Sequence, residues 1–98
     1  MAAAERVLSI DHPAGLHLRP AALFVRTANR FGSQVRLQNL SRDGSAAVDA
    51  KSMLGVMQAA VSQGHQVRVQ AEGADAAEAI ASLAALVESN FAEPRAPG

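Results

Sequence analysis

The stretch Gln66-Val67-Arg68-Val69-Gln70-Ala71-Glu72 carries the most regular pattern in the chain. Apolar and polar residues alternate along it, which is typical of a β-strand with one face in the core and one in water. After Gly73 the period changes to that of a helix, and Asp75 and Glu78 favour the N-terminal end of this helix. Its apolar stripe consists of Ile80, Leu83, Ala84, Val87 and Phe91.

Upstream of this stretch, the same two periods alternate along the chain. Strand patterns cover 6–11, 34–38 and, more weakly, 46–50, and a loop with the turn signal Asp43-Gly44 precedes the last of them. A helical period over 18–31 ends at Gly32, and a second helix starts after Ser52 and closes at Gly64. The first of these helices has an apolar face made of Ala21, Phe24, Val25, Ala28 and Phe31.

The element order is therefore β-α-β-β-α-β-α. Alternating strands with one-sided helices predict an α+β fold of two layers, with an antiparallel or mixed sheet and the helices on one side. The chain of 98 residues is expected to form a single domain over 1–98, with its core at about 6–91 and a flexible tail at 92–98.

Composition excludes several functional classes. Nine basic residues balance nine acidic ones, which argues against a nucleic-acid binder, since such proteins carry a basic excess. The chain has no cysteine, so disulfides and thiolate metal sites are excluded. Because no apolar stretch approaches the roughly 20 residues that span a bilayer, we expect no membrane insertion and a cytoplasmic location.

The segment Gly15-Leu16-His17-Leu18-Arg19-Pro20-Ala21-Ala22 is the strongest chemical signal. Pro20 suits a first helical turn, so His17 would lie at the helix N-terminus, where unpaired N–H groups and the helix dipole favour an anion. A neutral imidazole there can attack a phosphoryl group. The backbone N–H groups of Leu18 and Arg19 and the Arg19 guanidinium would then bind the phosphate.

The other histidines, His12 and His65, have no comparable surroundings and are expected to be structural. The three histidines show no metal-ligand spacing, so no metal is expected. We also expect no cofactor and no autonomous enzyme, because a second general base and a glycine-rich nucleotide loop are missing.

A second segment of interest begins at Ser52, which has the sequence position of a helix N-cap. Val56 and Ala60 can serve the core face of this short helix. Three other apolar residues would then remain outside: Met53, Leu54 and Met57.

Two motifs resemble those of the HPr family, the histidine-containing phosphocarriers of the bacterial sugar phosphotransferase system. Residues 15–21 are similar to the active-site motif, and Ala50-Lys51-Ser52-Met53-Leu54-Gly55-Val56-Met57 is similar to the regulatory serine segment. The element order also matches, and the resemblance covers residues 7–91. It implies an open-faced β-sandwich with a four-stranded antiparallel sheet and three helices on one face.

The resemblance also implies a function and partners. His17 would accept a phosphoryl group on Nδ1 from enzyme I, which takes it from phosphoenolpyruvate, and would pass it to EIIA proteins or domains. Arg19 matches the active-site arginine, and Ser52 matches the serine that HPr kinase/phosphorylase modifies in many bacteria. Six further residues match positions that dock partners in the family: Leu18, Ala22, Arg26, Met53, Leu54 and Met57.

This sequence departs from the family at three places. Leu18 stands where a small residue or threonine is common, and Ala14 where a polar residue is common. The 39–47 connection is longer than in the best-known members. We expect these departures to affect partner fit and the surface rather than the chemistry.

Other functions remain open. The chain could be a regulatory adaptor of the same fold that contacts a transcriptional regulator or enzyme through phosphorylated Ser52. It could serve a nitrogen-related or dihydroxyacetone branch, although the Ser52 region would then be expected to diverge. An unrelated two-layer module with an accidental motif is the third possibility. A carrier that meets two partners in turn is expected to be a monomer.

Overall fold

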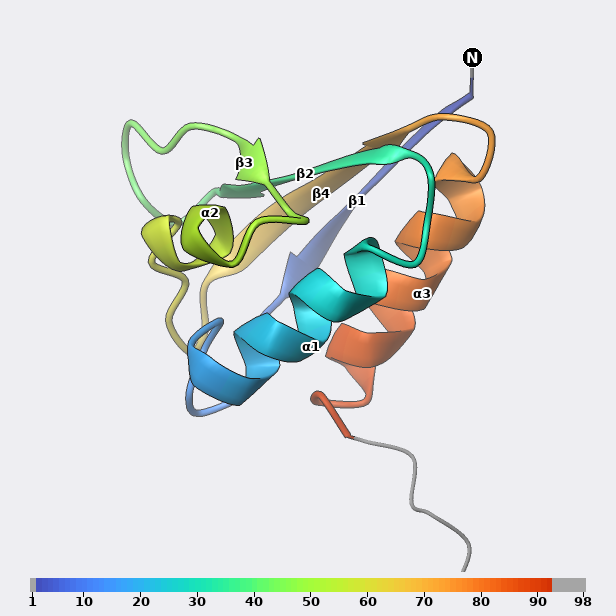
Figure 1. The fold of residues 1–98 in the computed structure, drawn as a ribbon. Coiled ribbons are helices and arrows are strands. Elements are labelled where there is room, and N and C mark those ends of the chain that lie inside the picture. The colour runs from blue at the N-terminus through green and yellow to red at the C-terminus, as the bar shows by residue number, and fades with distance from the viewer. Residues whose placement is uncertain (1, 93–98) are drawn as a thin grey trace, which may run out of the picture.

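The computed structural model describes residues 2–92 and shows a four-stranded sheet with three helices (Figure 1). In chain order the elements are β1 (Ala3–Ser9), α1 (Leu18–Ala28), β2 (Gln34–Asn39), β3 (Val48–Asp49), α2 (Met53–Gln58), β4 (Gln66–Glu72) and α3 (Ala76–Glu88). This is the predicted element order, and β4 has the predicted bounds. No helix within residues 2–92 has the length and apolar character needed to cross a membrane.

The sheet is antiparallel throughout and has the strand order β1-β4-β2-β3. β4 lies in the interior of the sheet, with β1 paired from Ala3↔Glu72 to Ser9↔Gln66 on one side and β2 on the other. β3 forms an edge and pairs with β2 only through Arg36↔Asp49 and Leu37↔Val48. The regular alternation at 66–72 thus belongs to a strand that is hydrogen-bonded along both edges.

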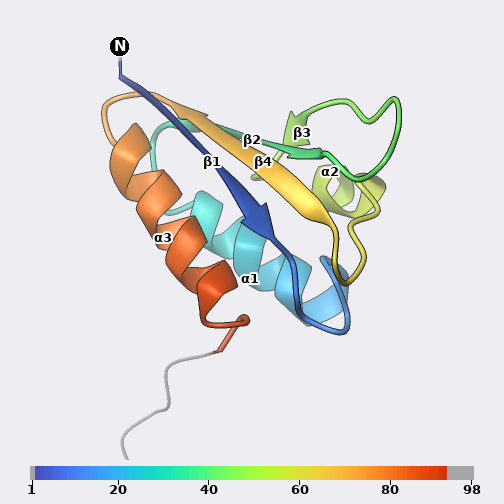
Figure 2. The same cartoon turned by 180° about the vertical axis from the view of Figure 1, so that it is seen from behind.

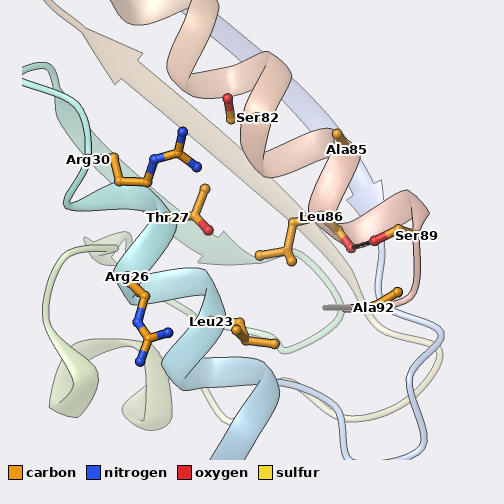
Figure 3. Close-up of a pocket in the computed structure, with 9 residues that line it drawn as sticks. All are labelled: Leu23, Arg26, Thr27, Arg30, Ser82, Ala85, Leu86, Ser89 and Ala92. Atoms are coloured by element: carbon orange, nitrogen blue, oxygen red, sulfur yellow. Dashed lines mark hydrogen bonds between the residues drawn. The ribbon is translucent and has the colours of Figure 1, made fainter. Parts of the chain in front are cut away.

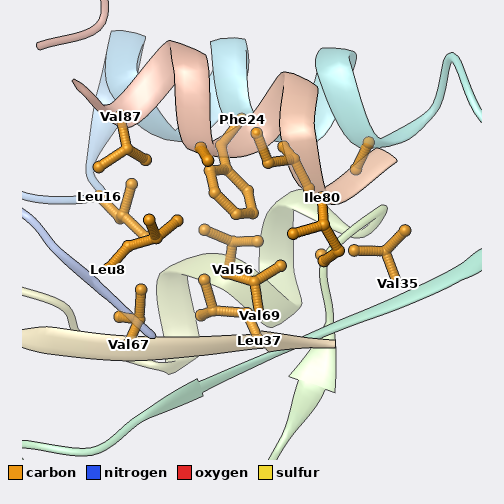
Figure 4. Close-up of a cluster of buried hydrophobic side chains, with 14 of the residues drawn as sticks. Leu8, Leu16, Phe24, Val35, Leu37, Val56, Val67, Val69, Ile80 and Val87 are labelled. Carbon is orange, nitrogen blue, oxygen red and sulfur yellow. The ribbon is translucent and has the colours of Figure 1, made fainter. Parts of the chain in front are cut away.

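All three helices lie on the same side of the sheet, and the other side is bare in the view from behind (Figure 2). The predicted two-layer α+β fold, an open-faced sandwich, is therefore confirmed. The core fills the space between the layers (Figure 4). Its fully buried residues include Phe24 from α1, Val35 and Leu37 from β2, Val67 and Val69 from β4, and Leu83 from α3.

The two strands with weaker patterns differ from their predicted bounds. β1 begins at Ala3 rather than at residue 6. The first residues of this edge strand are exposed or half-buried, so they leave no alternating pattern in the sequence. Ile10 lies beyond β1, although it is buried and its N–H donates to the His65 carbonyl at 2.9 Å. The strand predicted over 46–50 is reduced to Val48–Asp49.

The first two helices end earlier than predicted. α1 ends at Ala28, where the Asn29 side chain donates to the Val25 carbonyl at 2.9 Å, and Gly32 has no left-handed conformation. α2 ends at Gln58. The C-cap residue Ala59 is buried in place of the predicted Ala60, which adopts a left-handed φ of 52°.

The last predicted helix ends before Phe91. α3 ends at Glu88, and Phe91 turns back into the core with a φ of 61° and is buried. Its ring meets His12 edge to face, with 5.8 Å between the ring centroids. The predicted tail at 92–98 lies outside the described residues apart from Ala92.

Asp75 lies at the N-terminal end of α3, as predicted, but its side chain makes no cap hydrogen bond and instead joins the start of α3 to the turn before β2. Its carboxylate accepts hydrogen bonds from the Ser33 hydroxyl and from the N–H groups of Gly32 and Ser33, each of these two at 2.9 Å. The Ser33 hydroxyl bond is the main cause that lowers the pKa of Asp75 below its ordinary value. Gly73 lies against the same serine, because a Cβ there would stand 2.5 Å from Ser33 Oγ.

Candidate functional site

His17 lies where the β1–α1 loop meets α1. It is the N-cap residue of the helix, with an extended backbone (φ −122°, ψ 157°), and its side chain makes no cap hydrogen bond. The first N–H groups of a helix have no intrahelical acceptor, and the first turn of α1 contains no acidic residue. The part-exposed imidazole therefore lies at a helix end that favours an anion, as the sequence predicts.

The loop that carries His17 is held against the segment after α2. Gly15 has a φ of 59°, and a Cβ at this position would lie 2.2 Å from the Val61 carbonyl oxygen. The same carbonyl accepts a hydrogen bond from the N–H of Leu16 at 3.0 Å, and the Leu16 side chain is fully buried. These contacts fix the residue immediately before His17.

Leu18 follows His17 in an unusual conformation. Its φ of 49° is in the left-handed region, which costs an ordinary residue roughly 1–2 kcal/mol. Its side chain is 75% exposed, so burial of that side chain does not offset the cost. Strain of this kind persists only where the surroundings impose it, and it is common at functional sites. Arg19, the next residue, lies exposed in the first turn of α1.

The other two histidines use a ring nitrogen for structural hydrogen bonds, which agrees with the sequence prediction. His12 Nδ1 accepts from the N–H of Ala14 at 3.0 Å. His65 Nδ1 accepts from the N–H of Ser62 at 3.1 Å and lies 3.1 Å from the side-chain amide of Asn39. Within residues 2–92, no group of three or more potential ligands could hold a metal ion.

Ser52 is the N-cap of α2, as predicted. Its hydroxyl oxygen accepts a hydrogen bond from the N–H of Gly55 at 3.0 Å, and its backbone is extended. Gly55 suits this turn because a Cβ there would lie 3.0 Å from the Asp49 carbonyl oxygen. The serine side chain is half-buried at the start of the helix.

The predicted partner-binding residues of α1 and α2 are exposed, and α2 lies beside α1 on the same side of the sheet (Figure 1). The exposed fraction is 68% for Leu54, 37% for Met53 and 38% for Met57, whereas Val56 is fully buried. Single exposed apolar side chains are common on protein surfaces, but a contiguous group of them marks an interaction surface. We call the six residues that the sequence predicts to bind partners the docking patch: Leu18, Ala22, Arg26, Met53, Leu54 and Met57.

A separate hollow of about 640 Å³ lies between α1 and α3 (Figure 3). His17 does not line it, and Arg26 is the only docking-patch residue among those that do. Its walls consist of Leu23, Arg26, Thr27, Arg30, Ser82, Ala85, Leu86, Ser89 and Ala92. The candidate site is therefore the exposed surface around His17 and not this hollow.

Comparison with known proteins places the chain in a family. The family model described as the PTS HPr component phosphorylation site matches residues 4–89. The chain belongs to the HPr family. The predicted membership among the phosphocarriers of the phosphotransferase system is thereby confirmed.

Two curated members of the HPr family illustrate its range. The HPr-like protein Crh of Bacillus subtilis is 51% identical over 74 residues, which are 76% of this chain and 82% of Crh. The multiphosphoryl transfer protein of Haemophilus influenzae is 40% identical over 85 residues, which are 87% of this chain but only 17% of that protein. The chain thus spans a small part of this second relative.

Solved HPr structures have the same fold. HPr-C-His from Thermoanaerobacter tengcongensis has 46% identity and a TM-score of 0.84, over 94% of this chain and 99% of that chain. A structure of an HPr dimer from the same organism has 46% identity and a TM-score of 0.69, over 88% of this chain and 94% of that chain.

The sequence reasoning missed two residues that connect α1 to the segment before α2. Asn29, at the end of α1, donates a hydrogen bond to the carbonyl of Lys51, the residue before Ser52, and the Lys51 ammonium donates to the carbonyl of Phe31. Asparagine is a known residue type at helix C-termini, so Asn29 offered a signal. Nothing in the local sequence indicates that Lys51 would reach the carbonyl of Phe31, because these residues are far apart in the chain.

Proposed function

We propose that the protein is a phosphocarrier in which His17 accepts a phosphoryl group from phospho-enzyme I and passes it to an EIIA protein or domain. The observation that carries this proposal is the position of His17 at the N-cap of α1, with no cap hydrogen bond to occupy its side chain. The match of residues 4–89 to the HPr family supports it. Such a carrier would work in the cytoplasm.

The transfer step exchanges one P–N bond for another. The Nδ1 lone pair of neutral His17 attacks the phosphorus of the donor phosphohistidine, and the donor P–N bond breaks as the new one forms. The donor imidazole leaves in its neutral form because its other ring nitrogen keeps its proton, and the proton on Nε2 of His17 stays on the new phosphohistidine. The second step repeats this chemistry with His17 as the donor and a histidine of EIIA as the acceptor.

The surroundings of His17 can stabilise the transferred group. The N–H groups of Leu18 and Arg19 belong to the first turn of α1, where the helix dipole favours negative charge. Arg19 is an exposed residue, and its guanidinium can pair with the phosphoryl oxygens. Together they favour phosphohistidine without a metal ion or cofactor.

The docking patch would bind enzyme I and EIIA in turn. Its apolar members offer contact area, and methionine adapts to partners of different shape. Arg26 adds a positive charge, so a partner surface with apolar and acidic side chains would fit. Because both partners use one surface, each of them can reach His17. We still predict that the free carrier is a monomer.

Ser52 is proposed as a regulatory phosphorylation site for HPr kinase/phosphorylase. A phosphate is electrostatically tolerated at a helix N-terminus, so modification need not unfold α2. It would place negative charge beside Met53 and Leu54, where an acidic partner would be repelled.

A second candidate function is that of a regulatory adaptor, which the 51% identity to the HPr-like protein Crh favours. In this case phosphorylated Ser52 would contact a transcriptional regulator, and His17 would not need to accept phosphate. The two functions can coexist, because they use different residues.

The first prediction tests His17. Wild-type protein is incubated with phosphoenolpyruvate and the enzyme I of the same organism, and its intact mass is measured. We expect one acid-labile phosphoryl group, lost in His17→Gln and retained in the matched variant His12→Gln. If His17→Gln is still labelled, or if the wild type gains nothing, the carrier function is wrong. The adaptor function would then be tested by Ser52 labelling with the kinase.

A further inference from the structure

The docking patch has three residues on α1 and three on α2, and the relative position of these helices depends on tertiary contacts. α2 is only six residues long, and a helix this short is not stable by itself. Val56 is its only buried residue, so one apolar side chain sets its depth but not its rotation. Further contacts must therefore hold α2 in one orientation.

Two hydrogen bonds in opposite directions connect the C-terminal end of α1 to Lys51. The side-chain amide of Asn29 donates to the Lys51 carbonyl at 3.1 Å and to the Val25 carbonyl of its own helix at 2.9 Å. The ammonium of Lys51 donates to the Phe31 carbonyl at 2.7 Å. We call this pair of residues the Asn29–Lys51 clamp.

The turn between β3 and α2 transmits the position of Lys51 to α2. The Asp49 carboxylate accepts from the N–H of Lys51 at 2.9 Å, and the Asp49 carbonyl accepts from the N–H of Ser52 at 3.1 Å. Ala50 is fully buried, and its N–H donates to the Val35 carbonyl at 3.0 Å. Ser52 then caps α2, so no free segment separates the clamp from the helix.

We propose that Asn29 and Lys51 are positioning residues that hold the α2 half of the docking patch in register with the α1 half. This inference rests on the proposed phosphocarrier function. A patch whose two halves are pre-organised binds a partner without the entropic cost of ordering α2. Loss of the clamp should therefore weaken docking, while the chemistry at His17, at the other end of α1, is unchanged.

The test uses Lys51→Met, which keeps an apolar stem but cannot donate, and Asn29→Ala. Phosphorylation by enzyme I is measured at varied carrier concentration for each variant and for the double variant. We expect each single change to raise the KM of enzyme I for the carrier by roughly three- to tenfold, the range of one ordinary hydrogen bond, with kcat within about twofold. Because the two residues act together, the double variant should not exceed the larger single effect by much.

Two controls separate positioning from other causes. Arg30→Met removes a positive charge near the same helix end. It leaves both clamp hydrogen bonds in place but removes the guanidinium that lies 5.8 Å from the centroid of the Phe31 ring. Its effect on KM should be small and should vanish at high salt. Lys51→Arg keeps a donor and should recover part of the lost affinity. Hydrogen exchange of the α2 amides should quicken in Lys51→Met, whereas the urea midpoint of unfolding shows whether the variant is folded.

The outcomes distinguish this inference from the proposed function. If wild-type protein is a substrate and the clamp variants have an unchanged KM, the clamp inference is wrong and the carrier function stands. Equal effects of Lys51→Met and Arg30→Met would also overturn it, because charge alone would then explain them. If wild-type protein is not phosphorylated at His17, the carrier function fails and the clamp inference is withdrawn with it.

Discussion

Gly15 is the residue on which the His17 loop most depends. Its φ is left-handed, and a Cβ at this position would lie 2.2 Å from the Val61 carbonyl oxygen, which leaves no room for a side chain. Gly44 has a similar φ of 72°, but nothing lies within 4 Å of a Cβ there. A comparison of substitutions at Gly15 and Gly44 therefore separates the cost of the left-handed backbone from the cost of steric overlap.

We predict that Gly15→Ala lowers the free energy of unfolding by about 2–4 kcal/mol, from the left-handed penalty and the overlap with Val61 together. Gly44→Ala should cost only about 1–2 kcal/mol, since only the first of these contributes. Urea unfolding followed by circular dichroism measures both. Equal losses in the two variants would show that the contact with Val61 does not hold the loop.

Leu18 shows the opposite relation between residue and conformation. Its φ of 49° would suit glycine or asparagine, yet the chain has a leucine with an exposed side chain. Leucine at this position neither favours the backbone conformation nor buries its side chain in the core. Its presence would be explained by a contact between the side chain and another molecule. A contact with a partner protein, which we propose for the docking patch, would give the exposed Leu18 side chain such a role.

Among the secondary-structure elements, α2 combines a structural cap with a proposed regulatory site. The hydroxyl of Ser52 accepts the Gly55 N–H, and a cap of this kind stabilises a protein by about 1 kcal/mol. Asparagine and aspartate cap helices as well as serine does, and they differ from each other in charge. Substitutions of Ser52 can thus separate the effect of the cap hydrogen bond on stability from the effect of negative charge on partner binding.

We predict that Ser52→Ala lowers the free energy of unfolding by about 1 kcal/mol, whereas Ser52→Asn and Ser52→Asp retain most of it. Transfer from enzyme I should be slowed roughly threefold or more in Ser52→Asp relative to Ser52→Asn, because negative charge beside the patch repels an acidic partner. Thermal unfolding and phosphorylation rates check the two parts. Equal rates for the Asn and Asp variants would refute the electrostatic part.

Across the full fold, Asp75 connects the start of α3 to the turn that leads into β2. Three donors from Gly32 and Ser33 converge on its carboxylate, and they favour the charged form. The pKa of Asp75 is lowered from 3.8, so the folded state holds this proton less tightly than the unfolded state does. The stability from this group is present above the unfolded pKa and is lost as pH falls through the lower folded pKa.

We therefore predict that wild-type protein has a higher urea midpoint than Asp75→Asn at pH 7 and at pH 5, because the amide turns one acceptor into a donor that faces an N–H group. The difference should shrink as the pH falls below about 4. Asp43→Asn, the same charge change in the exposed 40–47 loop, should leave the midpoint at pH 7 unchanged. A difference that stays constant down to pH 2 would contradict the role of the Asp75 charge.

Local periodicity was sufficient for the fold class and the element order. The alternation at 66–72 predicts β4 to the residue, because an interior strand buries one face along its whole length. The N-cap positions of His17 and Ser52 also follow from neighbouring residue types alone. Edge strand β1 and the two-residue β3 have too little buried surface to leave such a pattern, so their bounds were wrong.

The amino-acid sequence alone specifies which faces are buried, where helices begin and which family motifs are present, since each of these depends on residues close together in the chain. Three features emerge only when the elements pack: the left-handed backbone at Leu18, the bonds between Asn29, Phe31 and Lys51, and the use of Asp75 by a distant turn. The conformation of Leu18 could not be predicted because the loop before it is held by Val61, which is distant in the sequence. The other two features could not be predicted because hydrogen-bond partners depend on which backbone groups remain unpaired when separate elements come together.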